Sequence, residues 1–131
     1  MLLTKEQILS IDDLKTEDVD VPEWGGVVRV RSLTGAERDE FESSLLVGKG
    51  KDREVNMTNA RARMVYLTAV DDEGKRLFTS PTDIKALGKK NAAALDALFA
   101  VGQKLSGLRK EDVDELLGNS ETAPSEDSTS D

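Results

Sequence analysis

The stretch Val21–Phe41, VPEWGGVVRVRSLTGAERDEF, predicts a β-hairpin followed directly by a helix. Its Gly25-Gly26 pair tolerates the positive φ angles that the central residues of a two-residue hairpin turn require. If these two glycines form the loop, counting outward sets Val21 opposite Val30. The sequence therefore predicts a tight hairpin over about residues 17–33.

Apolar and charged side chains alternate on both sides of this turn, as they do in strands that bury one face. The predicted apolar face carries Val19, Val21, Val28 and Val30, and the charged face carries Asp18, Asp20, Arg29 and Arg31. In the predicted register Asp20 faces Arg31, a pair that contributes roughly 0.2–1 kcal/mol. Because Pro22 has no N–H to donate, its strand is expected at an edge of the sheet. Helices must cover the apolar face, since an isolated hairpin is only marginally stable.

Capping signals and helical spacing predict the helices. Thr34 with Glu37 has the spacing of a capping box, in which each side chain binds the other residue's backbone N–H. Thr4 with Gln7 repeats this spacing near the N-terminus. Further helices are predicted over about residues 56–69, 81–87, 91–105 and 110–117, with a loop at 47–54 and a turn at 71–74. The predicted fold class is α+β and mostly α-helical, with the N-terminal hairpin packed on four to five helices.

Residues 1–118 have the composition of a single globular domain, large enough for a modest core. The remaining residues, 119–131, read NSETAPSEDSTSD and hold one aliphatic side chain, Ala123, beside four acidic ones. Such a segment cannot bury enough apolar surface to offset the entropy that ordering costs. We therefore expect a disordered acidic C-terminal tail.

The charge of the chain disfavours several classes of partner. Of its 131 residues, 26 are acidic and 18 basic, which gives a formal net charge of -8. Binding to nucleic acids or anionic membranes rests on clustered Lys and Arg, so neither is expected as a partner. No apolar run approaches the roughly 18–20 residues that cross a bilayer. The N-terminus is too short and too polar for a signal peptide, and a cytosolic protein is expected.

Cys and His are both absent from the chain. Their absence removes thiol nucleophiles, Ser-His and Cys-His constellations, disulfides and the usual zinc sites. Carboxylates, Lys, Tyr and hydroxyls remain, and no arrangement of them in the sequence points to a reaction. We therefore expect a protein that is not an enzyme, with no catalytic residues, no metal site and no cofactor.

Four residues are candidates for binding a partner. Trp24 lies beside the predicted turn, where its ring either covers the edge of the core or contacts another protein. Aromatic anchors of this kind are common at interfaces. Val113, Leu116 and Leu117 share one face of the last predicted helix. That helix either caps the core or docks on another protein.

The run VPEWGGVVRVRSLTGAERDEFE resembles the opening of phage tail assembly chaperones from siphovirus-like phages and prophages. Three later segments resemble later parts of the same proteins: NARARMVYLTAVDDEGKRLF, the predicted helix at 83–87, and LSGLRKEDVDELLGN. The likeness covers roughly residues 17–119. The chain departs from the family pattern at Arg109, where a capping Ser or Thr is usual.

The resemblance implies a role in assembly. Such chaperones bind the tape measure protein in the host bacterial cytoplasm, keep it soluble, promote tail tube assembly and do not enter the virion. Many are made as a pair by ribosomal frameshifting, and this chain has the character of the short form. The resemblance implies the tail tube protein as a partner of the longer form, and it leaves a homo-oligomer open. The alternatives are a structural protein of the tail or head–tail junction, retained in the particle, and a small acidic enzyme or regulator.

Overall fold

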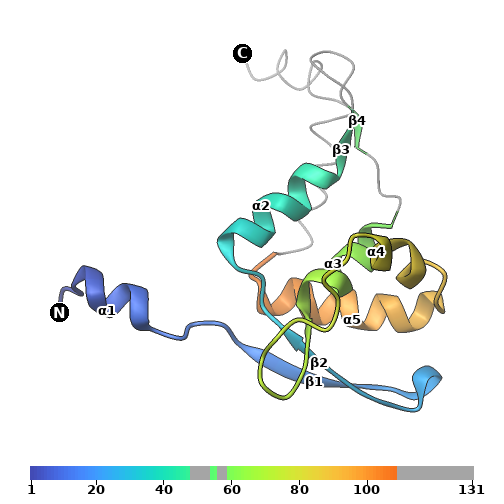
Figure 1. Ribbon diagram of the computed structural model, residues 1–131, viewed down its shortest axis with the longest axis horizontal. Helices are drawn as coiled ribbons and strands as arrows, with labels where there is room; N and C mark the ends of the chain where they lie inside the picture. The colour runs from blue at the N-terminus through green and yellow to red at the C-terminus, as the bar shows by residue number, and fades with distance from the viewer. Residues whose placement is uncertain (48–53, 56–58, 109–131) are drawn as a thin grey trace, which may run out of the picture.

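The computed structural model of the chain describes residues 1–47, 54–55 and 59–108. The described part is α+β and mostly helical, as the sequence predicts (Figure 1). Its elements are α1 (Lys5–Ser10), β1 (Thr16–Val21), a 3₁₀ turn (Pro22–Trp24), β2 (Gly26–Arg31), α2 (Gly35–Ser44), β3 (Leu46–Val47), β4 (Glu54–Val55), α3 (Ala60–Thr68), β5 (Ala69–Val70), α4 (Thr82–Leu87) and α5 (Ala92–Leu105).

A three-stranded antiparallel sheet with the order β1-β2-β5 forms one side of the fold. The strand that precedes Pro22, β1, is an edge strand, as predicted. Helix α5 lies against β1 and β2 and also packs on α3, so it joins the sheet to the helices (Figure 1). The core therefore lies between the apolar face of the sheet and these two helices.

The hairpin register differs from the predicted one. The turn contains Pro22–Gly25 rather than Gly25-Gly26 alone, and Val21 pairs with Gly26 instead of Val30. Pro22 starts the turn because its fixed φ suits the 3₁₀ conformation and it has no N–H for the ladder. Only Gly25 takes positive φ, at 72°, and its N–H donates to the Pro22 carbonyl at 3.1 Å.

The predicted charge pair of the hairpin is also wrong. Asp20 lies opposite Val27, and the pair that forms is Asp18 with Arg29, whose Nε donates to Oδ1 of Asp18 at 2.7 Å. The observed partner of Val21, Gly26, lies four residues from the predicted partner, Val30, so the register is shifted by an even number of residues. Because side chains alternate with a period of two, the predicted apolar and charged faces are both preserved. Val21 and Val30 are buried as expected.

Helix α3 fills the centre of the core and packs closely on α5. Met64 and Leu67 on α3 and Leu98 on α5 are almost fully buried. Gly102 allows the close approach, because a Cβ at this position would lie 2.9 Å from the Cγ and Sδ atoms of Met64. The aromatic rings of Phe41 on α2 and Phe99 on α5 lie 6.4 Å apart, which joins α2 to the same core.

Three two-residue strands of the described part were not predicted from the sequence. Of the helix expected at 56–69, residues 56–58 lie outside the described residues and α3 covers Ala60–Thr68. Ala69–Val70 instead form β5 beside β2. β3 and β4 pair with each other across the predicted loop at 47–54. Two-residue strands are too short to show a period, so their partner strands decide their conformation. The predicted helix at 110–117, the tail at 119–131 and residues 48–53 of the predicted loop lie outside the described residues.

Both predicted capping boxes are present. In the second box, Thr34 Oγ1 accepts from Glu37 N–H at 3.1 Å and Glu37 Oε1 accepts from Thr34 N–H at 3.0 Å. The Glu37 carboxylate also forms an ion pair with Arg31 and lies 4.0 Å from Arg76. Arg31 donates in addition to the Leu67 carbonyl, at 3.2 Å. One half-buried carboxylate thus links the end of β2, the start of α2 and the end of α3.

Gly102→Val is expected to destabilise the fold by about 1–3 kcal/mol, because its side chain would overpack the α3–α5 contact. Gly35→Val is the control, since no atom lies within 4 Å of a Cβ built at Gly35. Chemical denaturation of both variants measures the difference. Equal stabilities would contradict the close α3–α5 packing.

Glu37→Gln is expected to lower the free energy of unfolding by roughly 2–4 kcal/mol. The amide oxygen can still accept from Thr34 N–H, but the partly buried Arg31 loses its counter-charge. The exposed Glu40→Gln on the same helix is the matched control and should change stability by less than about 0.5 kcal/mol. Comparable losses in the two variants would show that the ion pair contributes nothing particular.

Candidate functional site

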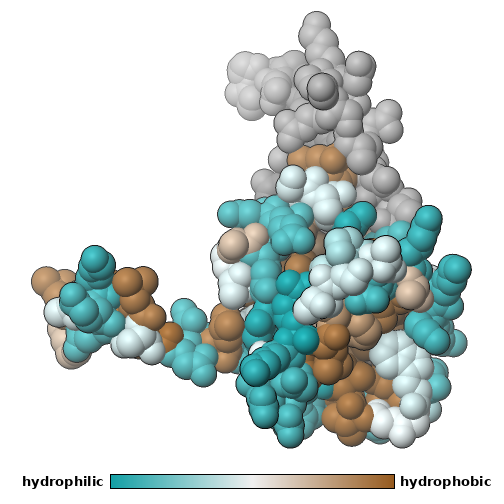
Figure 2. All heavy atoms as spheres, viewed as in Figure 1, coloured by the Kyte–Doolittle hydropathy of each residue, from teal (hydrophilic) through white to brown (hydrophobic). Residues whose placement is uncertain are grey.

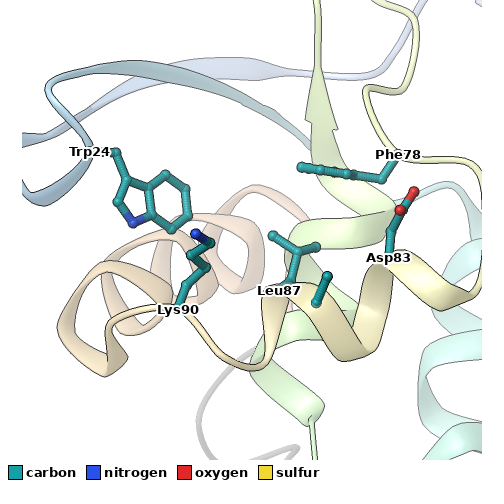
Figure 3. A pocket seen from close by; sticks show the side chains of 6 residues that line it. Trp24, Phe78, Asp83, Leu87 and Lys90 are labelled. Carbon is teal, nitrogen blue, oxygen red and sulfur yellow. The ribbon is translucent and has the colours of Figure 1, made fainter.

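An apolar groove of about 460 Å³ lies beside the hairpin turn (Figure 3). Four segments that are far apart in the sequence form it: the 3₁₀ turn, the loop after β5, α4 and the connection from α4 to α5. We call it the Trp24 groove, and its lining consists of Trp24, Phe78, Asp83, Ala86, Leu87 and Lys90.

Trp24 forms one side of the groove. Of the two roles that the sequence leaves open, packing on the core is observed, since the half-buried ring contacts the core cluster. The rest of the indole lines the groove and faces the open space above α4 (Figure 3). The 3₁₀ turn fixes the ring, because Pro22 and the left-handed Gly25 determine the backbone on either side. Trp24 is therefore both a core residue and an accessible apolar surface.

Phe78 forms the opposite side, and the backbone around it is held at several points. Leu77 N–H donates to the Ala69 carbonyl at 3.0 Å, just before Phe78. Just after it, the Thr79 carbonyl accepts from the hydroxyl of Tyr66 at 3.0 Å. These bonds fasten an irregular loop to α3 and β5, so the ring of Phe78 has a defined position although no regular element contains it.

Helix α4 forms the floor of the groove. Leu87 is buried and points between the two aromatic rings, while Ala86 is exposed on the same helix (Figure 3). Gly88 follows directly and lets α4 approach the start of α3, since a Cβ there would lie 2.4 Å from Asn59 Oδ1. The floor is thus set by the contact between α4 and α3.

The polar groups lie at the ends and the rim of the groove. Asp83 lies beside Phe78, and Lys90 lies beside the indole of Trp24 (Figure 3). Asp83 and Lys90 are the two charged residues of the lining, so the groove carries one charge of each sign. An apolar groove with few polar groups is the kind of surface that accepts the apolar face of a helix.

The turn that leads to Phe78 depends on one carboxylate. Asp71 Oδ1 accepts hydrogen bonds from the backbone N–H groups of Lys75 (3.0 Å) and Glu73 (2.8 Å). The bond from Lys75, followed by that from Glu73, lowers the pKa of the Asp71 carboxyl below its ordinary value, because both favour the charged form. Gly74 completes this turn with a φ of 83°.

Sequence reasoning identified Trp24 but missed Phe78 and Leu87 as its neighbours in a site. No local signal could have joined them, because they lie more than fifty residues beyond Trp24 in the chain. The other predicted binding residues, Val113, Leu116 and Leu117, lie outside the described residues. In the part of the chain that the structure describes, no group of three or more acidic side chains could hold a metal ion.

None of the family models, curated proteins or solved structures compared with this chain matches it. Within residues 1–47, 54–55 and 59–108, no helix combines the length and the apolar character that a membrane span requires.

Asp71→Asn is expected to reduce the loss of stability in acid. A carboxyl whose pKa is lowered by folding stabilises the protein above its unfolded pKa, and this contribution disappears as pH falls through the lowered pKa. Denaturation between about pH 5 and about pH 2 should therefore show a smaller decrease for the variant than for the wild type. The control, Asp72→Asn, removes the neighbouring carboxylate but keeps both hydrogen bonds to Asp71. Identical pH dependence in Asp71→Asn and the wild type would contradict this role of the turn.

Proposed function

We propose that this protein is a phage tail assembly chaperone that binds the tape measure protein through the Trp24 groove. In this proposal it acts in the host bacterial cytoplasm, keeps its client soluble, promotes tail tube assembly and does not enter the virion. The observation that carries the proposal is an open apolar groove on a body whose sequence resembles that family along most of its length.

The groove suits one apolar stripe of a long helical client. Trp24 and Phe78 would contact the two flanks of the stripe, and Leu87 its centre (Figure 3). A buried aromatic anchor commonly provides much of the binding energy at an interface. Lys90 would attract an acidic side chain beside the stripe, and Asp83 would attract a basic one.

The acidity of the chain fits a protein that keeps an apolar client in solution. A net charge of -8 makes complexes repel one another and so opposes their aggregation. The longer form expected from frameshifting would add a segment that recruits the tail tube protein. The chain described here would then supply the client-binding body that both forms share.

Co-expression with the tape measure protein is expected to raise that protein's soluble fraction, and Ala86→Glu is expected to abolish the gain. Ala86 is exposed in the groove, so the substitution introduces a charge there without removing a core side chain. Ala97→Glu, at an exposed position of α5, is the matched control and should behave as the wild type. An unchanged soluble fraction with both proteins well expressed would contradict the proposal.

Binding can be followed in the purified proteins because Trp24 is the only tryptophan. A client segment in the groove should shift its fluorescence emission to shorter wavelengths as the ring loses contact with water. Ala86→Glu should weaken binding at least about tenfold, which corresponds to the loss of one well-buried apolar contact. Binding without any change in emission would place the client elsewhere.

The alternative is a structural protein of the tail or head–tail junction. Mass spectrometry of purified particles separates the two proposals. The chaperone should be absent from virions or present only in traces, whereas stoichiometric amounts would favour the structural protein.

A further inference from the structure

The two charged residues of the Trp24 groove lie at its opposite ends. Asp83 lies beside Phe78 at one end, and Lys90 lies beside the indole of Trp24 at the other (Figure 3). Leu87 lies between the two ends, on the floor that α4 provides. The groove therefore runs along α4, from an acidic end to a basic end, over an apolar floor.

Both charges are available to a ligand. Among the described residues, neither Asp83 nor Lys90 takes part in an ion pair. Ser80 N–H donates to Asp83 Oδ2 at 3.3 Å, which holds the carboxylate at the start of α4 without neutralising it. An apolar helix in the groove would exclude water from beside these charges, and an ion pair made there would be screened less than one in open solvent.

The backbone between the two charged residues sets the distance between the ends. Gly88 keeps helical backbone angles where α4 ends. The N–H of Lys89 then donates to the Ala86 carbonyl at 3.2 Å, and the N–H of the next residue donates to the Leu87 carbonyl at 3.0 Å. The chain thus continues to coil as far as Lys90. A rise of about 1.5 Å per residue in the helix and about 2.0 Å in the tighter turns separates the ends by about 11 Å along α4.

Two turns of a client helix span the same length. Each turn rises about 5.4 Å, so two residues about seven positions apart lie about 11 Å apart on one face. The residues three and four positions after the first of them lie between these two, on the same face. The pattern acid-x-x-apolar-apolar-x-x-base, in either order of the charges, would therefore place its apolar pair over Leu87 and one charge at each end of the groove.

We infer that the Trp24 groove recognises a helix that carries one acidic and one basic side chain two turns apart on its apolar face. Lys90 binds the acidic side chain and Asp83 the basic one, so the charges fix the register of the client along α4. The inference rests on the proposed function, because it takes the groove as the client site, and it adds the residues that select among apolar helices. Each ion pair contributes roughly two- to fivefold in affinity, which is selectivity rather than most of the binding.

Two peptide isomers test this recognition. Both are blocked, alanine-based helices of about fifteen residues without tryptophan, and both contain Glu-x-x-Leu-Leu. The aligned peptide has Lys two helical turns after the Glu, whereas the displaced peptide has it two residues further on, on the opposite face. Their composition and net charge are identical, so attraction to the acidic body cancels. By Trp24 emission, the aligned peptide should bind at least about twofold tighter, and about 1 M salt should reduce the difference.

Substitutions in the groove assign the two charges. Lys90→Glu should weaken binding of the aligned peptide at least about twofold relative to Lys89→Glu. The latter is the matched control, because it makes the same charge change at an exposed residue outside the lining. A peptide with Lys at both charged positions should reverse this order. In Asp83→Asn, whose amide oxygen can still accept from Ser80 N–H, the aligned and displaced peptides should bind equally.

Equal affinities of the two isomers for the wild type would overturn the inference. Equal effects of Lys89→Glu and Lys90→Glu, or peptide binding without a change in Trp24 emission, would do the same. A tape measure protein whose solubility does not rise on co-expression would contradict the proposed function but leave the peptide preferences unchanged, so the two proposals fail separately. Circular dichroism would verify that the variants are folded.

Discussion

The ion pair between Arg31 and Glu37 is the contact on which the arrangement of the body depends. Glu37 caps α2 and binds Arg31, and Arg31 in turn donates to the Leu67 carbonyl near the end of α3. Both charged side chains are only about one-seventh exposed, at 13% and 15%. A bond in such surroundings is screened little by water, and each charge would be costly without the other. The sheet, α2 and α3 are thus fixed to one another at a single point.

The elements held by this ion pair also position the two aromatic residues of the Trp24 groove. Arg31 is the last residue of β2, and the hairpin turn with Trp24 lies at the other end of this strand. α3 continues into β5, and the loop after β5 contains Phe78. Hydrogen bonds from Leu77 to Ala69 and from Tyr66 to Thr79 hold this loop. Neither aromatic residue belongs to an α-helix or a β-strand, so the distance between the two rings depends on the strands and helices that hold their turns. A binding surface made from turns can be well defined when a rigid core holds the turns.

Local rules predicted what depends on local chemistry. The two faces of the hairpin, both capping boxes and the edge position of β1 follow from side-chain alternation, hydrogen-bonding groups and Pro22. The register did not follow, because counting outward from Gly25-Gly26 assumed the shortest turn and gave Pro22 no part in it. β5 was not predicted, because its pairing with β2 overrides the helical pattern of the preceding residues. The groove and the exposure of α1 depend on packing between distant segments, which no local pattern encodes.

An open apolar groove, together with the exposed apolar side chains of α1, would promote aggregation if nothing opposed indiscriminate contact. The net charge of -8 repels identical copies, but at physiological salt this repulsion is screened beyond about 8 Å. At shorter range the distribution of charge matters more than its sum. At the groove itself the lining holds one acidic residue, Asp83, and one basic residue, Lys90. A client helix with side chains of both signs beside its apolar stripe would therefore complement the groove, whereas a second acidic copy would gain little from its charges.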